Sequence, residues 1–598
     1  MLRIAVEQFR PRKGAYSENL ERLREIFVRL AGPGVEESPH LVVFPEAALT
    51  GYFLEGGVQE LAVTAERLYQ DLSGLHTDAD AAPFEIVIGF YEVWRTRLHN
   101  SVLVASLGGS DAGIRHVHRK VFLPTYGVFD EERFVEPGME VRACDTRLGR
   151  LAAIVCEDAW HSLVPTIAAL DGAEYLVVVS ASPARGIGPG VGGGEDSRPT
   201  SVRRWERIGE AIASEHGLYL ILAQLPGFEG GKALQGGSCV FGPRGELLAR
   251  APLFEEATLQ VQIDPEDITR ARAEVPLLSD LELRLPYLIQ TLNRRRGGPE
   301  AGSFQGVPVV RSKGGLAKPH ESIASTGDPL TIDPDLTRRW LVEFIRDEVL
   351  RRRGFERVVV ALSGGVDSAL VTFLAAEALG ADNVTAIRMP YRTSSPESLD
   401  HAQLVIDATR VRSETIEITD AVDALAAALP DAAGATRLGN VMARMRMITL
   451  FDRSAALDAL PLGTGNKTER LLGYFTWHAD DSPPVNPIGD LFKTQVWALA
   501  RAMGVPPVIV DKPASADLVV GQTDEADFGV PYLTADGILH RLLLGSRPEK
   551  LAALGFSEQE VALVRKRLDS THWKRRLPTV AMLSQTAIGE FYLRPVDY

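Results

Sequence analysis

The chain is poor in cysteine and has no long apolar run, and each shortage excludes a class of protein. Its 598 residues include three cysteines, Cys144, Cys156 and Cys239, too few for a disulfide scaffold and typical of a reducing compartment. Nowhere do about 18 apolar residues follow one another, so we expect no membrane span. The N-terminal stretch MLRIAVEQFRPRKG contains no long apolar segment either. We therefore expect a cytoplasmic protein that does not act at a membrane.

Basic residues are also fewer than acidic residues. Lys and Arg number 64 against 79 Asp and Glu, which gives a net charge of −15 and argues against nucleic acid as the main partner. Hydrophobic residues make up 45% of the chain and charged residues 24%, an ordinary globular balance. At ~100–200 residues per domain, this length predicts two large domains or several small ones.

Two patterned regions are separated by one that lacks a pattern. Residues 1–265 alternate short apolar strands with helices, including 17–32 and 201–216, which predicts a layered α/β domain. Residues 266–330 accumulate Pro, Gly and Ser, and we take them as an interdomain linker. Residues 331–598 alternate again, which predicts a second α/β domain with a doubly wound parallel sheet. The two halves show no self-similarity, so they are not tandem copies of one fold.

The segment Ala361–Ser368, ALSGGVDS, joins a β-branched run to a helical pattern. Its two glycines let backbone N–H groups turn toward one point, and a helix N-terminus favours a bound anion such as a phosphate chain. No Gly-Lys-Ser/Thr closes the loop, so it is not a Walker loop. A tight turn alone would not also require Ser363, Asp367 and Ser368. SGGVDS instead resembles the pyrophosphate loop of enzymes that cleave ATP between its α- and β-phosphates.

In the first half, three reactive side chains lie next to apolar strands or Pro-marked turns. Glu46 follows an apolar strand, Lys120 precedes a Pro-marked turn, and Cys156 ends a buried strand. A carboxylate can take the proton of a thiol, the thiolate can attack an amide, and an ammonium can stabilise the resulting oxyanion. Taken singly, the thiol could be a small buried apolar group and the other two could be surface charges. Their joint placement favours acyl transfer.

The second half offers groups suited to a nucleotide and a metal ion. Asp367 and Glu469 are hard oxygen ligands of the kind that Mg²⁺ takes together with phosphates. Arg388 follows a strand, where it could stack on or hydrogen-bond a nucleotide. Arg444 and Arg446 lie on a Met-rich helix and could equally form a packed, snorkelling face. Further candidates are Thr464, Lys493, Lys512 and Ser515.

The segments FPE, HRKVFLPTYGVFDEERF and CEDAWH together resemble the nitrilase superfamily, specifically its glutamine-hydrolysing members fused to a synthetase. The resemblance implies a four-layer αββα sandwich, with Glu46 as general base, Lys120 as oxyanion stabiliser and Cys156 as nucleophile. Glu131 matches a supporting carboxylate of the superfamily, although Glu132 is adjacent. The residues implied to line the amide pocket are Tyr126, Glu157, Ser182 and Arg185.

SGGVDS, GTGNKTE, NPIGDLFKTQV and GQTDE, in this order, resemble NAD synthetases of the ATP pyrophosphatase type, so the whole chain resembles the glutamine-dependent NAD synthetases. The resemblance implies glutamine hydrolysis, adenylation of the nicotinate carboxylate of deamido-NAD with release of pyrophosphate, and amidation to NAD with release of AMP. It also implies a homo-oligomer. Mg²⁺ would lie on Asp367 and Glu469, and Arg444 would contact the dinucleotide. The implied ATP-binding residues are Ser363, Gly364, Gly365, Val366, Asp367, Ser368, Arg388, Thr464, Lys493 and Ser515.

The chain departs from this family in the segment LLGYFTWHADDSPPVNP. Trp477 and Pro484 stand where the family has a Lys and an Asp that contact deamido-NAD, and of that set only Asp480 remains. Either neighbouring groups such as His572 and Lys574 take over these contacts, or the preference shifts toward another pyridine carboxylate such as nicotinate mononucleotide.

Two other classes of function compete with this interpretation. One is an ATP pyrophosphatase that amidates or thiolates a purine or RNA, which the acidic balance and NPIGDLFKTQV disfavour. The other is a nitrilase-like binding or regulatory module with an inactive thiol site, which the intact set of Glu46, Lys120 and Cys156 disfavours.

Overall fold

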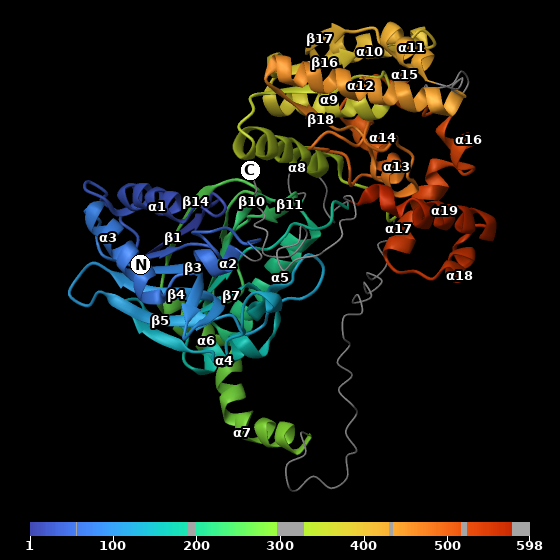
Figure 1. Ribbon diagram of the computed structural model, residues 1–598. Helices are drawn as coiled ribbons and strands as arrows, with labels where there is room; N and C mark the ends of the chain where they lie inside the picture. The colour runs from blue at the N-terminus through green and yellow to red at the C-terminus, as the bar shows by residue number, and fades with distance from the viewer. Residues whose placement is uncertain (55–56, 189–197, 296–327, 430–433, 516–522, 577–598) are drawn as a thin grey trace. The chain divides into compact units, whose positions relative to one another are not determined.

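The computed structural model describes residues 1–54, 57–188, 198–295, 328–429, 434–515 and 523–576. The described residues form two compact units (Figure 1). The first contains residues 1–185 and 200–295, and the second contains 186–188, 198–199 and the described part of 328–576. Most of the Pro-, Gly- and Ser-rich part of the expected linker lies outside the described residues.

The first unit is built on two six-stranded sheets (Figure 1). The first sheet has the order β14-β1-β2-β3-β4-β5, formed by β1 (Leu2–Gln8), β2 (Leu41–Val43), β3 (Phe84–Trp94), β4 (Arg97–Leu107), β5 (Gly113–Arg119) and β14 (Ala257–Ile263). The second has the order β13-β12-β9-β8-β7-β6, formed by β6 (Ala143–Thr146), β7 (Gly149–Val155), β8 (Tyr175–Ser180), β9 (Tyr219–Gln224), β12 (Cys239–Phe241) and β13 (Leu247–Arg250). A separate hairpin joins β10 (Pro226–Glu229) to β11 (Lys232–Gln235).

Alternate residues of the first sheet enter different layers, because successive side chains of a strand point to opposite faces. Ile4 and Val6 of β1 belong to the core shared with the second sheet, whereas Ala5 packs in the cluster that contains helix residues such as Phe27 and Leu68. The helices on this outer face are α1 (Tyr16–Ala31) and α3 (Ala65–Asp78). The second sheet is covered by α4 (Leu163–Leu170) and α5 (Thr200–His216). The predicted αββα sandwich is confirmed.

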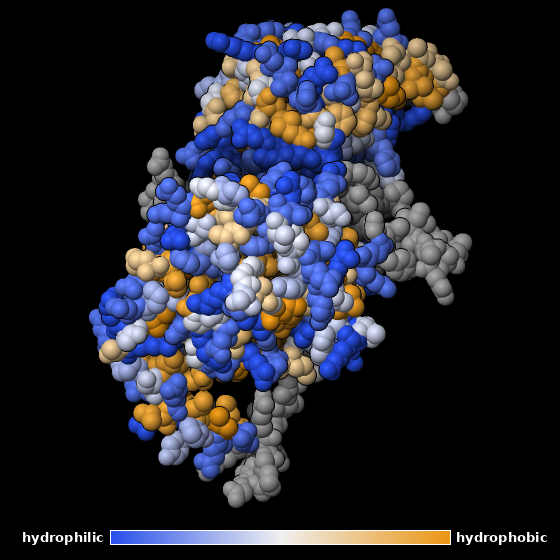
Figure 2. All heavy atoms as spheres, turned by 90° about the vertical axis from the view of Figure 1, so that its left-hand side faces the viewer, coloured by the Kyte–Doolittle hydropathy of each residue, from blue (hydrophilic) through white to orange (hydrophobic). Residues whose placement is uncertain are grey.

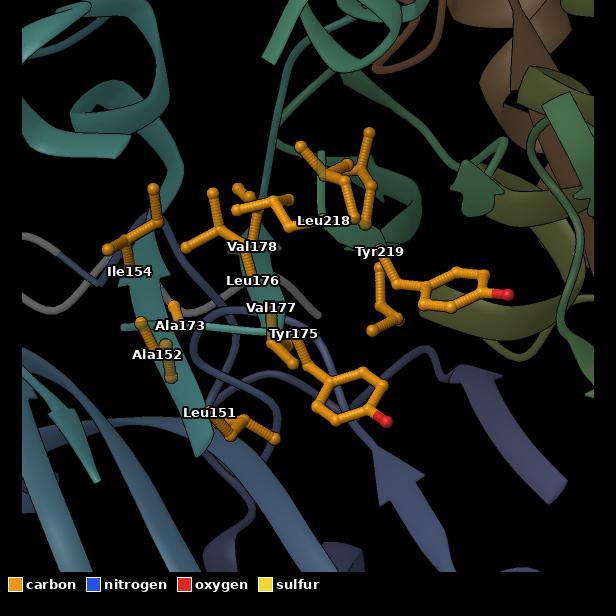
Figure 3. Close-up of a cluster of buried hydrophobic side chains, with 14 of the residues drawn as sticks. Leu151, Ala152, Ile154, Ala173, Tyr175, Leu176, Val177, Val178, Leu218 and Tyr219 are labelled. Atoms are coloured by element: carbon orange, nitrogen blue, oxygen red, sulfur yellow. The ribbon is translucent and has the colours of Figure 1, made fainter. Parts of the chain in front are cut away.

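The core of the second sheet contains long apolar runs because its central strands are buried on both faces (Figure 3). Every residue of β8 is buried, as expected for a parallel strand between two layers. Tyr175 of β8 pairs in register with Tyr219 of β9. Their rings stack with centroids 6.1 Å apart and an interplanar angle of 12°. The stack joins the starts of β8 and β9, and β7 pairs in parallel with β8 up to Val155, directly before Cys156.

Two helices follow β14 inside the segment 266–330, which the sequence analysis treats as linker. These are α6 (Glu266–Glu274) and α7 (Leu277–Arg295). The Arg272 guanidinium of α6 donates hydrogen bonds to the carbonyl oxygens of Gly217 (3.0 Å) and Ala173 (2.8 Å). The start of this segment is therefore helical and is held against the first unit.

The second unit contains a four-stranded, fully parallel sheet in the order β17-β16-β15-β18. Its strands are β15 (Arg357–Ala361), β16 (Val384–Arg388), β17 (Arg412–Thr415) and β18 (Ala459–Leu462). Val358 and Val360 pack on one face in the cluster with α8 (Pro334–Arg346), α9 (Val366–Leu379), α10 (Pro396–Thr409) and α14 (Lys493–Ala502). Val359 packs on the other face with α11 (Thr419–Ala428) and α12 (Ala435–Leu457). The predicted doubly wound domain is confirmed.

The remaining helices of the second unit gather around an apolar cluster that includes Leu472, Phe528, Leu539 and Val564. They are α13 (Lys467–Leu472), α16 (Asp524–Phe528), α17 (Tyr532–Leu543), α18 (Pro548–Leu551) and α19 (Glu558–Ser570). Short helices α2 (Val58–Leu61) and α15 (Pro507–Val510) lie in the first and second unit respectively. Within the described ranges, no helix has the length and apolar character needed to span a membrane.

Candidate active sites

In the first unit, Cys156 occupies a sharp turn directly after β7. Its φ of 44° lies in the left-handed region. This backbone conformation costs a residue other than glycine about 1–3 kcal/mol. The thiol is 6% exposed and accepts a hydrogen bond from the Ser180 hydroxyl at 3.3 Å. Burial, followed by the charge of Glu46, raises the pKa of Cys156 well above its ordinary value, and Lys120 opposes that rise. The thiolate therefore depends on the nearby ammonium.

Lys120 is fully buried between two carboxylates. Its Nζ lies 3.0 Å from Glu46 Oε1 and 2.7 Å from Glu131 Oε2. Burial lowers the pKa of Lys120, but Glu131 and Glu46 more than offset this effect, so the pKa lies well above its ordinary value. Burial raises the pKa of Glu46, against the influence of Lys120. A carboxylate with a raised pKa next to a stable ammonium is suited to accept a thiol proton.

The structure brings Glu131, rather than the exposed Glu132, into contact with Lys120. Asn100, which the sequence analysis missed, donates from its Nδ2 atom to Glu46 Oε1 and to Glu131 Oε1, both at 2.7 Å. Its only signal in the sequence is a polar residue at the head of the apolar stretch NSVLVASL. Glu46 also accepts a hydrogen bond from the Ala181 amide at 2.7 Å.

The residues expected to line the amide pocket differ in their burial and in their hydrogen-bond partners. The Tyr126 hydroxyl donates to the Glu157 carboxylate, at 2.9 Å and 2.8 Å from its two oxygens. Ser182 is buried, and its hydroxyl accepts a hydrogen bond from Trp205 Nε1 at 2.8 Å. Arg185 is exposed, and its amide donates to Ser201 Oγ at 2.9 Å.

In the second unit, the Gly-rich loop lies between β15 and α9, as predicted. Gly364 has a φ of 83° and a Cβ there would collide with the carbonyl oxygen of Ser398. Gly365 is the N-cap of α9, where free N–H groups and the helix dipole favour a phosphate. Ser363 and Ser368 lie with their hydroxyls 3.1 Å apart. Val366 begins the helix.

The two proposed magnesium ligands meet at one cation in the structure. Lys493 Nζ forms an ion pair with Asp367 and lies 3.6 Å from Glu469 Oε1. Burial, followed by the charge of Asp367, raises the pKa of Glu469 to about 8. Asn466, which the sequence analysis missed, donates to Asp367 Oδ1 at 2.9 Å and caps the helix that carries Glu469. Its signal was the Asn-x-x-Glu capping box in GTGNKTE.

This donor set fits Mg²⁺, because two converging carboxylates already share a cation and Mg²⁺ typically takes one or two carboxylates together with phosphates. Among the described residues, no group of three or more His, Cys, Asp or Glu side chains could hold a metal ion, so Mg²⁺ here would also need phosphate oxygens as ligands. The loop that is expected to bind the phosphates leads into α9, which carries Asp367 in its first turn.

Other nucleotide candidates lie at the carboxyl ends of the parallel strands, where ligands bind in open α/β sheets. Arg388 ends β16 and donates to Gln403 Oε1 at 2.8 Å. Thr464 follows β18, and Lys493 begins α14. Ser515 is exposed, and the first two residues of GQTDE lie outside the described ranges.

A buried carboxylate that the sequence analysis missed holds the Glu469 and Lys493 helices together. Asp536 of α17 accepts hydrogen bonds from Thr468 Oγ1 (2.5 Å), the Thr494 amide (2.9 Å) and Thr494 Oγ1 (2.8 Å). The Lys493 amide donates in turn to Thr468 Oγ1 at 3.0 Å. Nothing in the local sequence around Asp536 indicates this role.

The candidate dinucleotide contacts surround Trp477. Arg444 Nη2 donates to the Trp477 carbonyl oxygen at 3.1 Å, and Asp480 accepts from the Thr476 amide at 2.9 Å. Lys574 donates to the carbonyl oxygens of Gly473 and Phe475, each at 2.8 Å. His572 Nδ1 lies 2.7 Å from the Asp569 carbonyl oxygen.

Two family models match the chain: carbon-nitrogen hydrolase over residues 3–273 and NAD synthase over residues 338–578. Fold and sites therefore define a class of ATP-dependent amidating ligase that carries its own carbon-nitrogen hydrolase domain. The chain is 48% identical over 270 residues to the NH(3)-dependent NAD(+) synthetase of Trichlorobacter lovleyi, covering 45% of this chain and 98% of that protein. It is 49% identical over 262 residues to the Chlorobaculum parvum enzyme of the same name, covering 44% and 94%. The chain belongs to the NAD synthetase family.

A solved structure resembles the whole chain. The glutamine-dependent NAD+ synthetase of Acinetobacter baumannii in complex with adenosine diphosphate has a TM-score of 0.67 and 21% identity, covering 100% of this chain and 98% of that one. At this identity the likeness is one of fold. The two family models confirm the expected pairing of a nitrilase-type domain with an NAD synthetase domain on one chain.

Gly364→Ala should destabilise the second unit by about 1–3 kcal/mol, because alanine at this φ is strained and its Cβ meets the Ser398 carbonyl. Thermal unfolding measures the loss. Gly365→Ala is the matched control, because Gly365 has a φ of −87° and its added Cβ meets nothing closer than Ser363 Oγ at 3.4 Å. Equal melting temperatures for both variants would contradict the prediction.

Proposed function

We propose that this chain makes NAD from deamido-NAD, with glutamine as the nitrogen donor and ATP as the energy source. The observation that carries the proposal is the buried cluster of Glu46, Lys120 and Glu131 beside the Cys156 turn, on a chain whose other half belongs to the NAD synthetases. An ammonia-dependent synthetase would need no such cluster.

In the first unit, Glu46 takes the thiol proton and the Cys156 thiolate attacks the glutamine amide. Lys120 stabilises the oxyanion that forms, since its ammonium is held charged by two carboxylates. Glu46 returns that proton to the departing nitrogen, which leaves as ammonia. Water then gives a proton to Glu46 and attacks the thioester, glutamate is released, and Glu46 passes the proton back to the Cys156 sulfur. Glu157 directly follows Cys156 and accepts a hydrogen bond from Tyr126. These two residues, together with Ser182 and Arg185, are assigned to glutamine binding.

In the second unit, the nicotinate carboxylate attacks the α-phosphate of ATP, and pyrophosphate leaves toward Ser363–Ser368. The N–H groups at the start of α9 and the Lys493 ammonium offset the charge of the leaving group. Ammonia then displaces AMP and forms the nicotinamide. Arg388, Thr464 and Ser515 are assigned to ATP binding.

Asp367 and Glu469 would hold Mg²⁺, with Asn466 orienting both carboxylates. When bound, the ion neutralises phosphate charge in the departing pyrophosphate. Asp524 adds negative charge nearby: its carboxylate is buried, accepts from Tyr532 Oη at 2.9 Å, and leaves Oδ1 without a partner in the described structure.

Cys156→Ala should reduce glutamine-supported NAD synthesis by ~10³-fold or more and leave ammonia-supported synthesis intact, because the thiol and the adenylation site lie in separate units. Product analysis with glutamine or ammonium chloride as nitrogen source measures both. Cys144→Ala, which changes a thiol outside the cluster, should retain both activities. Loss of both activities in Cys156→Ala would overturn the assignment of roles.

Asp367→Asn and Glu469→Gln should each lower pyrophosphate release by ~10²-fold or more with either nitrogen source, while basal glutamine hydrolysis remains measurable. Asp490→Asn is the matched control, since the Asp490 side chain is 98% exposed and pairs with Lys467. Normal pyrophosphate release and unchanged Mg²⁺ dependence in either ligand variant would rule out the metal assignment.

The Trp477 segment supports a second candidate substrate, nicotinate mononucleotide. The Trp477 ring packs edge-on against Trp573, with centroids 5.2 Å apart and an interplanar angle of 86°, and Trp573 is 49% exposed. Lys574 already donates to two backbone carbonyl oxygens, which weakens its candidacy as a substitute dinucleotide contact. An aromatic face here would favour stacking on a ring over an ionic contact.

We expect deamido-NAD to remain the better substrate, and Trp477→Lys to change the ratio of kcat/KM for deamido-NAD to that for nicotinate mononucleotide by about 10-fold, or ~1.4 kcal/mol. Initial rates with each substrate, side by side, measure the ratio. Trp477→Phe keeps an aromatic face and should preserve it. A wild-type preference for the mononucleotide would favour the second candidate, and an unchanged ratio in Trp477→Lys would exclude a role for this side chain.

We also propose a cytoplasmic homo-oligomer that acts on small molecules, without nucleic acid or a membrane. Helix α7 supports the oligomer, because Leu283, Tyr287, Ile289 and Leu292 are 47–71% exposed. In Figure 2, apolar side chains gather at the lower end of the first unit, at the height where Figure 1 draws α7. Exposed apolar surface of this kind is most simply covered by a second copy of the chain, and sedimentation of the purified chain tests this.

A further inference from the structure

One buried carboxylate outside the reacting groups has an unusual set of partners. The Asp158 side chain is fully buried. Its Oδ1 accepts hydrogen bonds from the amides of Val121 and Phe122, both at 3.0 Å. Its Oδ2 accepts from the Val155 amide at 3.2 Å and lies 2.8 Å from His118 Nε2. A buried carboxylate is tolerated only with such partners.

These partners belong to the two segments that carry the reactive groups. The end of β5 and the residues after it contribute His118, Val121 and Phe122, all within two residues of Lys120. The other segment is the turn itself, because Val155 and Asp158 stand on either side of Cys156. The carboxylate therefore ties the backbone that bears the ammonium to the backbone that bears the thiol.

The same hydrogen bonds act on a strained turn. Cys156 has a φ of 44°, a conformation that persists only when the surroundings over-determine it. The bond from the Val155 amide to Asp158 closes the turn around Cys156. The bonds to Val121 and Phe122 anchor that turn to a second segment, so the strained backbone and the position of Lys120 are fixed together.

His118 holds the Asp158 carboxylate in place. The imidazole side chain is fully buried, its Nε2 faces Asp158, and its Nδ1 is buried without a hydrogen-bond partner in the described part of the chain. Asp158 is thus its one polar contact there. His116, two positions earlier on β5, has no contact of this kind with Asp158 among the hydrogen bonds of the described residues.

We infer that Asp158, seated by His118, is a positioning residue for the thiol chemistry: it sets the separation between the Lys120 ammonium and the Cys156 sulfur. The expected effect on kinetics rests on the proposed glutamine hydrolysis. The geometry of Asp158 and its partners does not depend on that function. Neither side chain enters the reaction; both act through Lys120 and Cys156.

The test compares Asp158→Asn, His118→Leu and His118→Gln in the full-length chain, with His116→Gln as matched control. Asp158→Asn should lower kcat for glutamine hydrolysis by about 100-fold, the cost of a small misplacement of reacting groups, with KM nearly unchanged because glutamine contacts remain. His118→Leu should show a similar loss. His118→Gln, whose amide nitrogen can still donate to Asp158, should recover most of the rate, and His116→Gln should match the wild type.

A second readout separates this inference from the proposed function. Mass spectrometry follows the rate at which iodoacetamide alkylates Cys156, which should fall about 10-fold in Asp158→Asn because the thiolate loses its ammonium partner. If the wild type releases no glutamate from glutamine, the proposed function fails while the alkylation rates still test the positioning role.

Ammonia-supported synthesis and thermal unfolding report whether each variant is folded. If Asp158→Asn does not fold, the comparison of His118→Leu with His118→Gln tests the inference instead. Wild-type kcat and alkylation in Asp158→Asn, or in His118→Leu, would overturn the inference. So would an equal loss in His118→Gln and His118→Leu, since that would show that the bond to Asp158 is not what matters.

Discussion

Each unit of this protein is organised around a buried ammonium that lies between two carboxylates. Lys120 lies between Glu46 and Glu131, and Lys493 between Asp367 and Glu469. A charge can be buried only if its partners are present and correctly oriented. The strand ends and helix starts that supply these partners must therefore converge. In the proposed reactions these charges would serve as an oxyanion partner in the first unit and a pyrophosphate partner in the second.

A further layer of buried carboxylates holds the segments that carry these charges. Asp158 joins the Lys120 segment to the Cys156 turn, and Asp536 joins the start of the Glu469 helix to the start of the Lys493 helix. Both carboxylates accept hydrogen bonds from backbone amides as well as from side chains. Backbone amides move only with the chain, so such contacts fix segments rather than individual side chains. Two unrelated folds thus use the same device for the same physical need.

The sequence predicts the parts of each site that lie within one segment. Cys156 and Glu46 were found because each follows an apolar strand, and the phosphate loop because its glycines stand between a strand and a helix. Asn100, Asp158 and Asp536 were not found. Asn100 bonds residues 54 and 31 positions away in the chain, and Asp158 bonds His118 40 positions away. Those distances are set by strand order and register, which local patterns do not contain.

The two turns assigned to the proposed reactions differ in how strongly the surrounding structure must hold them. Both place a residue at positive φ, but the phosphate loop uses Gly364, which tolerates that conformation, whereas the nitrilase-type turn uses Cys156. A phosphate is bound by backbone N–H groups, so its turn needs no side chain there. A nucleophile must have one and therefore has a strained backbone, which the surrounding structure must hold in place. The hydrogen bonds of Asp158 answer that requirement, and the Gly364 turn has no comparable need.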